Sequence, residues 1–316
     1  MSIPTEVFLA TMFSGIGHAT QDSGLLIASS TDGAKFQNIR SNSQPVYTPT
    51  TGMRDPMILY WEGQWHLVYS YGPNVSPLLF LTKSSDMLHW IPVGSLRLAA
   101  DKGVGVGGSF HRPGTANHFI DVPQWIVDPA GNIHLIACTD DDHHWVEIHP
   151  LCPDSATWGD QANWSEVATI TDCNGRPLVQ GNSFVTVRNG MYYMAFNGID
   201  ATVYYLRTSA NLTSGWSEAR QLNVESKVEN GDSENLVCLA DGALRFYISN
   251  GNSLTKLMWY VDSTNLGVDW TAPKVVKFEG FGPEGINWAQ VVRVTDPAAI
   301  SAMVTANQLP TKREGI

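Results

Sequence analysis

Three carboxylates in this sequence stand in polar phrases that lead into apolar runs, where a carboxyl group can exchange protons with a ligand. The sharpest phrase is Met53-Arg54-Asp55-Pro56, in which the proline fixes the backbone where a strand is expected to begin. Asp121 precedes Val122-Pro123-Gln124-Trp125, and Glu234 lies within Gly231-Asp232-Ser233-Glu234-Asn235. Each carboxylate could instead cap a turn. We favour a functional role for Asp55 because Arg54 adjoins it, and both interpretations stay open for Asp121 and Glu234.

A repeated phrase predicts the elements that position these groups. An apolar strand is followed by Ser-x-Asp or Ser-x-Asn and then by an aromatic residue, which in the four visible copies is Phe36, Trp90, Trp216 and Trp270. The first two copies and the last two are each 54 residues apart, and the middle interval of 126 has room for a divergent copy near Trp158 or Trp164. Five β-repeats of this size predict an all-β, five-bladed β-propeller with four-stranded blades. Asp32 and Asp86 belong to the repeat, and we expect them to cap turns.

The two ends of the chain are expected to share one blade. Residues Asn287–Val294 read as an inner strand without a blade after it, whereas Val7–Phe13, Gly24–Ala28 and Phe36–Ile39 read as outer strands without an inner one. Joining them closes the ring and removes an open sheet edge. We therefore predict one domain over 1–316, with 297–316 as a peripheral C-terminal extension.

In such a propeller the starts of the inner strands and the loops after the second strands lie at one end, so their polar residues converge on one mouth. In addition to the three carboxylates, the residues expected there as ligand-binding groups are His18, Asp22, Arg54, His111, His118, Gln124, Asn182 and Trp288. Carboxylates, imidazoles and amides with aromatic rings suit a sugar, which needs many hydrogen-bond partners and an apolar surface for its ring.

The composition limits the classes of partner that the protein is expected to bind. The formal net charge of −11 argues against nucleic acid, and no apolar run approaches the ~20 residues of a membrane span. Residues 1–10 lack the basic and apolar regions of a signal peptide, so both a secreted mature form and a cytoplasmic protein stay open. We expect a monomer or a small homo-oligomer with a carbohydrate partner.

The sequence gives weaker expectations about disulfides and bound metal ions. Cys138 and Cys238 lie in apolar strand patterns and are expected to be buried thiols, whereas Cys152 and Cys173 could form a disulfide in an oxidising compartment. The run 140–144, Asp-Asp-Asp-His-His, could hold a divalent cation, although a solvated acidic loop is the favoured interpretation. We expect no required cofactor and leave open a structural Ca²⁺ in the central channel.

Several phrases resemble those of five-bladed glycosidases of glycoside hydrolase families 43, 32 and 117. The phrase Arg54-Asp55-Pro56-Met57-Ile58, followed by Gly63-Gln64-Trp65-His66-Leu67, resembles their Arg-Asp-Pro strand. The run 24–36 with Ser30-Thr31-Asp32-Gly33, and Val122-Pro123-Gln124-Trp125, resemble two more of their phrases. As architecture, the resemblance covers nearly the whole chain.

The resemblance implies a base, an acid and a third carboxylate that orients and tunes the acid. Asp55 matches as the base or as a group that stabilises the transition state. Gln124 stands where the family has a carboxylate, so Asp121 or Glu234 is expected to take the role of acid. His111 or His118 is a further candidate acid, as the resemblance to family 117 suggests. In the third phrase, Val179-Gln180-Gly181-Asn182 stands where family 43 usually has Glu-Gly-Pro.

The leading expectation is a glycoside hydrolase of arabinofuranosidase, xylosidase or galactosidase type that acts on a poly- or oligosaccharide with inversion. The alternative is a propeller that binds carbohydrate without hydrolysis, because Gln124 and Gln180 stand at carboxylate positions. A protein-interaction propeller fits poorly, since the chain lacks the Gly-His…Trp-Asp repeat of that class.

Overall fold

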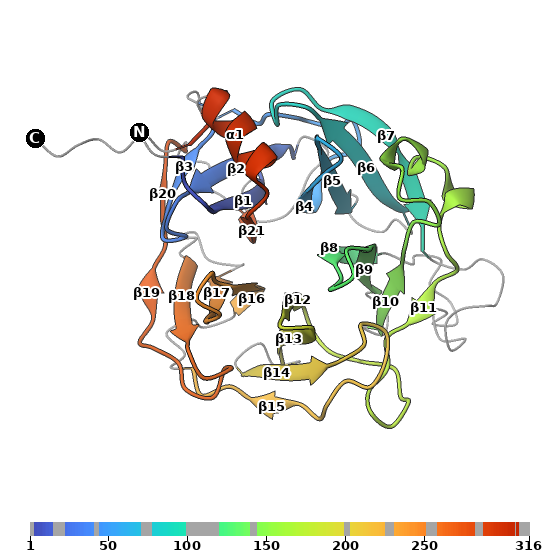
Figure 1. Ribbon diagram of the computed structural model, residues 1–316, viewed down its shortest axis with the longest axis vertical. Helices are drawn as coiled ribbons and strands as arrows, with labels where there is room; N and C mark the ends of the chain where they lie inside the picture. Colours follow the sequence, from blue (N-terminus) through green and yellow to red (C-terminus); the bar gives the residue numbers. More distant parts are fainter. Residues whose placement is uncertain are drawn as a thin grey trace, which may run out of the picture.

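The computed structural model describes most of the chain as five antiparallel blades around a central axis (Figure 1). The described residues are 3–14, 23–40, 44–70, 78–98, 120–139, 144–198, 203–224, 231–250, 258–281, 287–306 and 308–309. Within them, residues 231–234, 250, 287 and 288 are described by their backbone alone.

The first four blades are each built in chain order, from the innermost strand outwards. The first blade contains β4 (Arg54–Trp61), β5 (Gln64–Ser70), β6 (Leu78–Ser84) and β7 (Ile91–Arg97). The second contains β8 (Ile120–Val127), β9 (Ile133–Thr139), β10 (His144–Ile148) and β11 (Ala168–Thr169), with the short 3₁₀ helices η2 (Ser155–Thr157) and η3 (Gln161–Asn163) between β10 and β11. The third contains β12 (Ser183–Arg188), β13 (Met191–Asn197), β14 (Tyr204–Ser209) and β15 (Arg220–Gln221). The fourth contains β16 (Gly231–Cys238), β17 (Leu244–Asn250), β18 (Met258–Ser263) and β19 (Lys274–Val275).

The fifth blade joins the two ends of the chain, as predicted. Its inner strand β21 (Asn287–Val294) pairs antiparallel with β1 (Val7–Phe13), so that Val7 lies opposite Val294. Next come β2 (Leu25–Ser30) and β3 (Lys35–Asn38), and β20 (Lys277–Glu279) adds an unpredicted fifth strand, parallel to β3. The closure ties the N-terminal segment to the last inner strand and leaves no open gap in the ring.

The repeated Ser-x-Asp phrase caps the turn after the third strand of a blade. The Asp86 carboxylate accepts hydrogen bonds from the Leu88 and His89 backbone N–H groups, both at 2.8 Å. Asp32 accepts from two backbone N–H groups in the same way in the fifth blade. Both aspartates therefore have the predicted turn-capping role. The second blade lies in the long interval between the visible copies, with Trp158 and Trp164 both buried, so the divergent fifth copy of the repeat is present.

The core lies between neighbouring blades. Trp145 of the second blade and Trp216 of the third are fully buried in one cluster. After β21, Asp296 caps α1 (Pro297–Thr305), which buries Ala299, Ile300 and Met303 against a cluster that includes Val7 of β1. The start of the predicted C-terminal extension is thus a helix that packs on the fifth blade. No helix in the described ranges is long and apolar enough to cross a membrane.

Candidate functional site

Two inner strands begin with the same irregularity. The register of β4 against β5 shifts between Arg54 and Met57, and that of β8 against β9 shifts between Asp121 and Gln124. At each shift a residue before proline has a positive φ, 45° for Asp55 and 49° for Val122. Such a bulge re-aims the side chains on either side of it. Because pairing continues through the bulge, β8 begins at Ile120, before the bulge.

The two bulges bring the side chains of neighbouring blades into contact. Arg54 Nη2 lies 3.0 Å from Asp121 Oδ2, and the Ser70 hydroxyl donates a 3.0 Å hydrogen bond to Asp121 Oδ1. Asp55 is hydrogen-bonded to Asp121 and accepts a hydrogen bond from the Val122 backbone N–H. We call Asp55 and Asp121 the carboxylate pair. Its members are 66 positions apart in the sequence and belong to different blades.

The environment of the carboxylate pair favours a shared proton. Asp55 is 1% exposed, and its Oδ2 has no hydrogen-bond partner. Burial, the charge of Asp121 and the hydrogen bond to Asp121 raise the pKa of Asp55 well above its usual range, against the opposing effects of Arg54 and the Val122 N–H. Two carboxyl groups this close do not both ionise readily. The arrangement therefore favours a protonated Asp55 beside the ion pair of Arg54 and Asp121.

The other predicted site residues fall into two groups. Asn182 lies directly before β12, Glu234 lies in β16 and Trp288 in β21, all near the start of an inner strand and so at the same end as the carboxylate pair. The side chains of Glu234 and Trp288 lie outside the described part of the chain. His18, Asp22, His111 and His118 belong to segments outside the described residues altogether, as do residues 140–143 of the predicted acidic run.

Gln124, expected to bind substrate, joins two blades instead. Its Nε2 donates to the Val185 carbonyl at 2.8 Å, and its Oε1 accepts from the Val185 N–H at 2.9 Å. Asn235 bridges from β16 to the Ala289 carbonyl and the Val291 N–H of β21 in the same manner. Inner strands of adjacent blades do not pair with each other, so an amide side chain can take the place of a peptide group between them. In the sequence, the only signal of this bridging role is that Gln124 and Asn235 are both amides at the same position of an inner strand.

The cavity in the described part of the central channel offers one carboxylate to the Ca²⁺ ion that the sequence left open. A cavity of about 610 Å³ lies along the later parts of the inner strands, lined by Met57, Val185, Leu236 and neighbouring residues. Ca²⁺ takes about 6–8 oxygen ligands. Asp296, the one carboxylate that lines this cavity, already caps α1 through the Ala298 and Ala299 N–H groups.

The four cysteines are free thiols, so the proposed Cys152–Cys173 disulfide is not formed. Both side chains are exposed, and the Cys173 thiol faces Glu218 at 3.9 Å instead. Cys138 is buried as expected, whereas Cys238 is only partly buried.

Comparison with known proteins shows which solved structures share this fold. No family model matches the chain, and no curated protein matches it in sequence. Among solved structures, an exo-β-1,3-galactanase from Clostridium thermocellum is 13% identical with a TM-score of 0.61, over 94% of this chain and 72% of the other. A GH43 β-1,3-galactosidase with bound galactodeoxynojirimycin is 13% identical with a TM-score of 0.58, over 87% and 91%. A GH43 enzyme from Xanthomonas citri is 11% identical with a TM-score of 0.53, over 88% and 93%. The chain therefore has the propeller fold of the glycoside hydrolase family 43 structures.

Proposed function

We propose that this protein is a glycoside hydrolase that cleaves a poly- or oligosaccharide at the mouth formed by the starts of its inner strands. The observation that carries the proposal is the carboxylate pair, in which the buried Asp55, with its raised pKa, lies beside Asp121, which is paired with Arg54. Acid–base cleavage of a glycosidic bond requires at least two carboxyl groups, one protonated and one ionised, so their proton affinities must differ.

The hydrogen bond within the pair limits the roles of its members. The acid and base of a glycosidase stand ~5–5.5 Å apart in retaining and ~6.5–9.5 Å apart in inverting enzymes, since the scissile bond lies between them. Hydrogen-bonded carboxyl groups are closer than this, at about 2.5–2.7 Å. Asp55 and Asp121 therefore act together on one side of the bond, and a third group is needed on the other side.

We assign the roles accordingly. The carboxylate pair acts as the base and accepts a proton from the attacking water. Glu234 acts as the acid that protonates the leaving oxygen. Its strand β16 begins at the same end of the propeller, one blade removed from β8 across β12. Because the pair activates water rather than attacking the sugar itself, the expected stereochemical outcome is inversion.

The printed activities of the similar structures suggest the first substrates to test. Two act on β-1,3-linked galactose and one, from Lactobacillus brevis, is an α-L-arabinofuranosidase with a TM-score of 0.52. We therefore propose galactosides and arabinosides first, and xylosides next. The proposed reaction requires no cofactor, and its substrate is a carbohydrate. We propose that the protein acts as a monomer or a small homo-oligomer.

The experiment is a screen of aryl glycosides and polysaccharides, with sugar release measured for the wild type, Asp55→Asn and a matched control, Asp86→Asn. Asp86 is a turn-capping aspartate of the repeat, so the control makes the same chemical change outside the site. Product from the wild type and the control, but not from Asp55→Asn, supports the proposal. Equal turnover by all three proteins contradicts it.

The alternative is a propeller that binds carbohydrate without hydrolysis. It depended on glutamines at carboxylate positions, and Gln124 bridges two blades while Gln180 donates to the Ser183 hydroxyl at 2.8 Å and accepts from Arg207. Binding of a glycan with no product from any substrate would revive it.

A further inference from the structure

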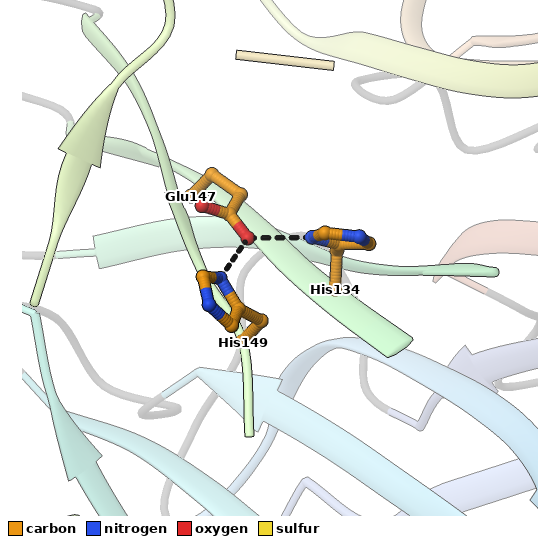
Figure 2. A group of neighbouring side chains, drawn as sticks. All are labelled: His134, Glu147 and His149. Carbon is orange, nitrogen blue, oxygen red and sulfur yellow. Dashed lines mark hydrogen bonds and ion pairs between the residues drawn. The ribbon is translucent and has the colours of Figure 1, made fainter. Parts of the chain in front are cut away.

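A second cluster of polar side chains lies in the second blade, away from the carboxylate pair (Figure 2). Leu135 of β9 lies opposite Ile148 of β10, so the next position pairs His134 with His149. Glu147 precedes His149 by two residues and projects from the same face of the sheet. Directly opposed and diagonal positions on one face of an antiparallel pair bring side chains into contact. The three residues thus meet because of strand register.

The three side chains converge on one point. Glu147 Oε1 lies 2.7 Å from His134 Nδ1 and 3.0 Å from His149 Nδ1, and Figure 2 shows both rings turned toward the carboxylate. One possible ligand atom from each of the three residues lies within 4.8 Å of the other two, the one such group among the described residues. The Glu147 side chain is only 3% exposed, whereas that of His149 is 45% exposed. The cluster is therefore anchored in the blade and open to solvent on one side.

An outer carboxylate orients one of the two rings. The far nitrogen of His134, Nε2, lies 3.5 Å from Asp128 Oδ2. Asp128 is itself held by the Asn132 backbone N–H at 2.7 Å and by the Asn132 side chain at 2.9 Å. Metal-binding histidines usually donate their second N–H to a carboxylate in this way, which fixes the tautomer and the ring orientation. With the Nε2 proton held by Asp128, Nδ1 of His134 is the nitrogen that could lose its own proton and bind an ion.

We propose that His134 Nδ1, His149 Nδ1 and Glu147 Oε1 bind a divalent first-row transition metal ion of the Zn²⁺ or Co²⁺ type. Two imidazoles and a carboxylate suit these ions, whereas Ca²⁺ and Mg²⁺ prefer oxygen ligands alone. Water completes the coordination on the solvent side, where His149 is exposed. In the metal-free protein the same atoms are joined by hydrogen bonds, so loading replaces two N–H···O contacts with metal bonds and releases protons.

The site is separate from the proposed catalytic mouth. Asp121 lies opposite Cys138 on β9, four residues from His134 along the strand. At about 3.4 Å per residue the two places are about 14 Å apart. The ion would therefore join β9 to β10 near the third blade without touching the carboxylate pair. Metal binding at this cluster does not depend on the proposed hydrolase activity.

The test measures metal binding directly on the full chain. Chelator-treated protein is titrated with Zn²⁺ by calorimetry and with Co²⁺ by visible absorption, which reports the coordination geometry. The variants are His149→Ala, whose side chain is half-exposed and tolerates removal, and Asp128→Asn. The control is His89→Ala, because His89 forms a single exposed pair with Asp86, 2.7 Å from its Oδ2, and has no third ligand.

We expect the wild type and His89→Ala to bind one equivalent of Co²⁺ with the spectrum of a low-coordinate site. Asp128→Asn should weaken binding by about 10- to 100-fold, as loss of an outer-shell carboxylate does, and His149→Ala should weaken it further. Thermal unfolding in chelator checks that each variant is folded. Absence of binding by the wild type, or equal affinity of His149→Ala and wild type, would overturn the proposal and leave the cluster as a hydrogen-bonded tether between two strands.

Discussion

Replacing Asp55 with asparagine should abolish activity without unfolding the protein. Asparagine has the shape of aspartate and is one of the few residues that tolerates a φ of 45°. Its amide oxygen can accept the Val122 N–H bond, and its NH₂ group can donate to Asp121 where the wild type uses a shared proton. Asp121 would keep its ion pair with Arg54. Every contact of the buried group is thus preserved except the exchangeable proton.

The raised pKa gives the sign of the stability change. A carboxyl group that binds its proton more tightly in the folded state adds stability that is fully present below its ordinary pKa of 3.8 and is lost as pH rises through the raised pKa. Each pKa unit of elevation corresponds to about 1.4 kcal/mol. Asparagine does not ionise, so Asp55→Asn should become more stable relative to wild type as pH increases. Turnover should fall by about 10²- to 10⁴-fold, the usual contribution of a proton-transfer group.

The assay pairs urea unfolding at pH 5, 7 and 8.5, followed by tryptophan fluorescence, with sugar release on the best substrate of the screen. Asp55→Ala serves as a second variant, because alanine at this φ costs about 1–2 kcal/mol and loses the hydrogen bonds as well. Asp55→Asn should be the more stable of the two. A loss of more than about 2 kcal/mol by Asp55→Asn at pH 7, the size of a broken buried hydrogen bond, would contradict the expected preservation of its contacts. Unchanged turnover by the folded fraction would contradict the role of Asp55 in proton transfer. Both results together would refute the reasoning.

Three further predictions follow from the same geometry. Arg54→Met leaves Asp121, whose side chain is 12% exposed, without its cation, and should cost about 3–5 kcal/mol in urea unfolding. Adding Asp121→Asn should restore at least half of that loss, and purely additive effects would show that the ion pair is not coupled. Gln124→Leu strands the N–H and carbonyl of Val185 and should destabilise the fold by about 2–5 kcal/mol, with turnover per folded molecule unchanged. Loss of turnover without loss of stability would instead indicate that Gln124 binds the substrate. Burial lowers the pKa of His66 from 6.5 to about 4, so the unfolded chain binds the extra proton and stability should fall by about 3 kcal/mol as pH drops from 6.5 to 4. His66→Gln should flatten that dependence, as measured by the urea midpoint at pH 7.5 and 4.5.

The propeller was predictable because its signals are local. Each copy of the repeat carries its own capped turn, and the Asp86 carboxylate needs only the next three residues to make its bonds. The tryptophan that follows closes the same turn, since Trp90 Nε1 donates to the Met87 carbonyl at 2.9 Å. Counting the copies then predicted five blades and the closure of β21 on β1.

The strand limits depended on pairing that sequence patterns do not record. Proline after Asp55 and after Val122 interrupts the apolar pattern, although the strands pair through the bulge. Similarly, β20 is only three residues long and pairs parallel with β3, a partner that comes from the opposite end of the chain.

The sequence by itself determined which phrases lead into the inner strands, because each copy of the repeat ends in a turn that the next inner strand must follow. Only the tertiary structure decided which residues of these phrases touch. Asp55 meets Asp121 because two bulges from adjacent blades face each other, and Gln124 turns to Val185 because the inner strands spread too far apart to pair. The cluster of His134, Glu147 and His149 likewise depends on one strand register, in which a slip by a single residue would move these side chains to opposite faces of the sheet.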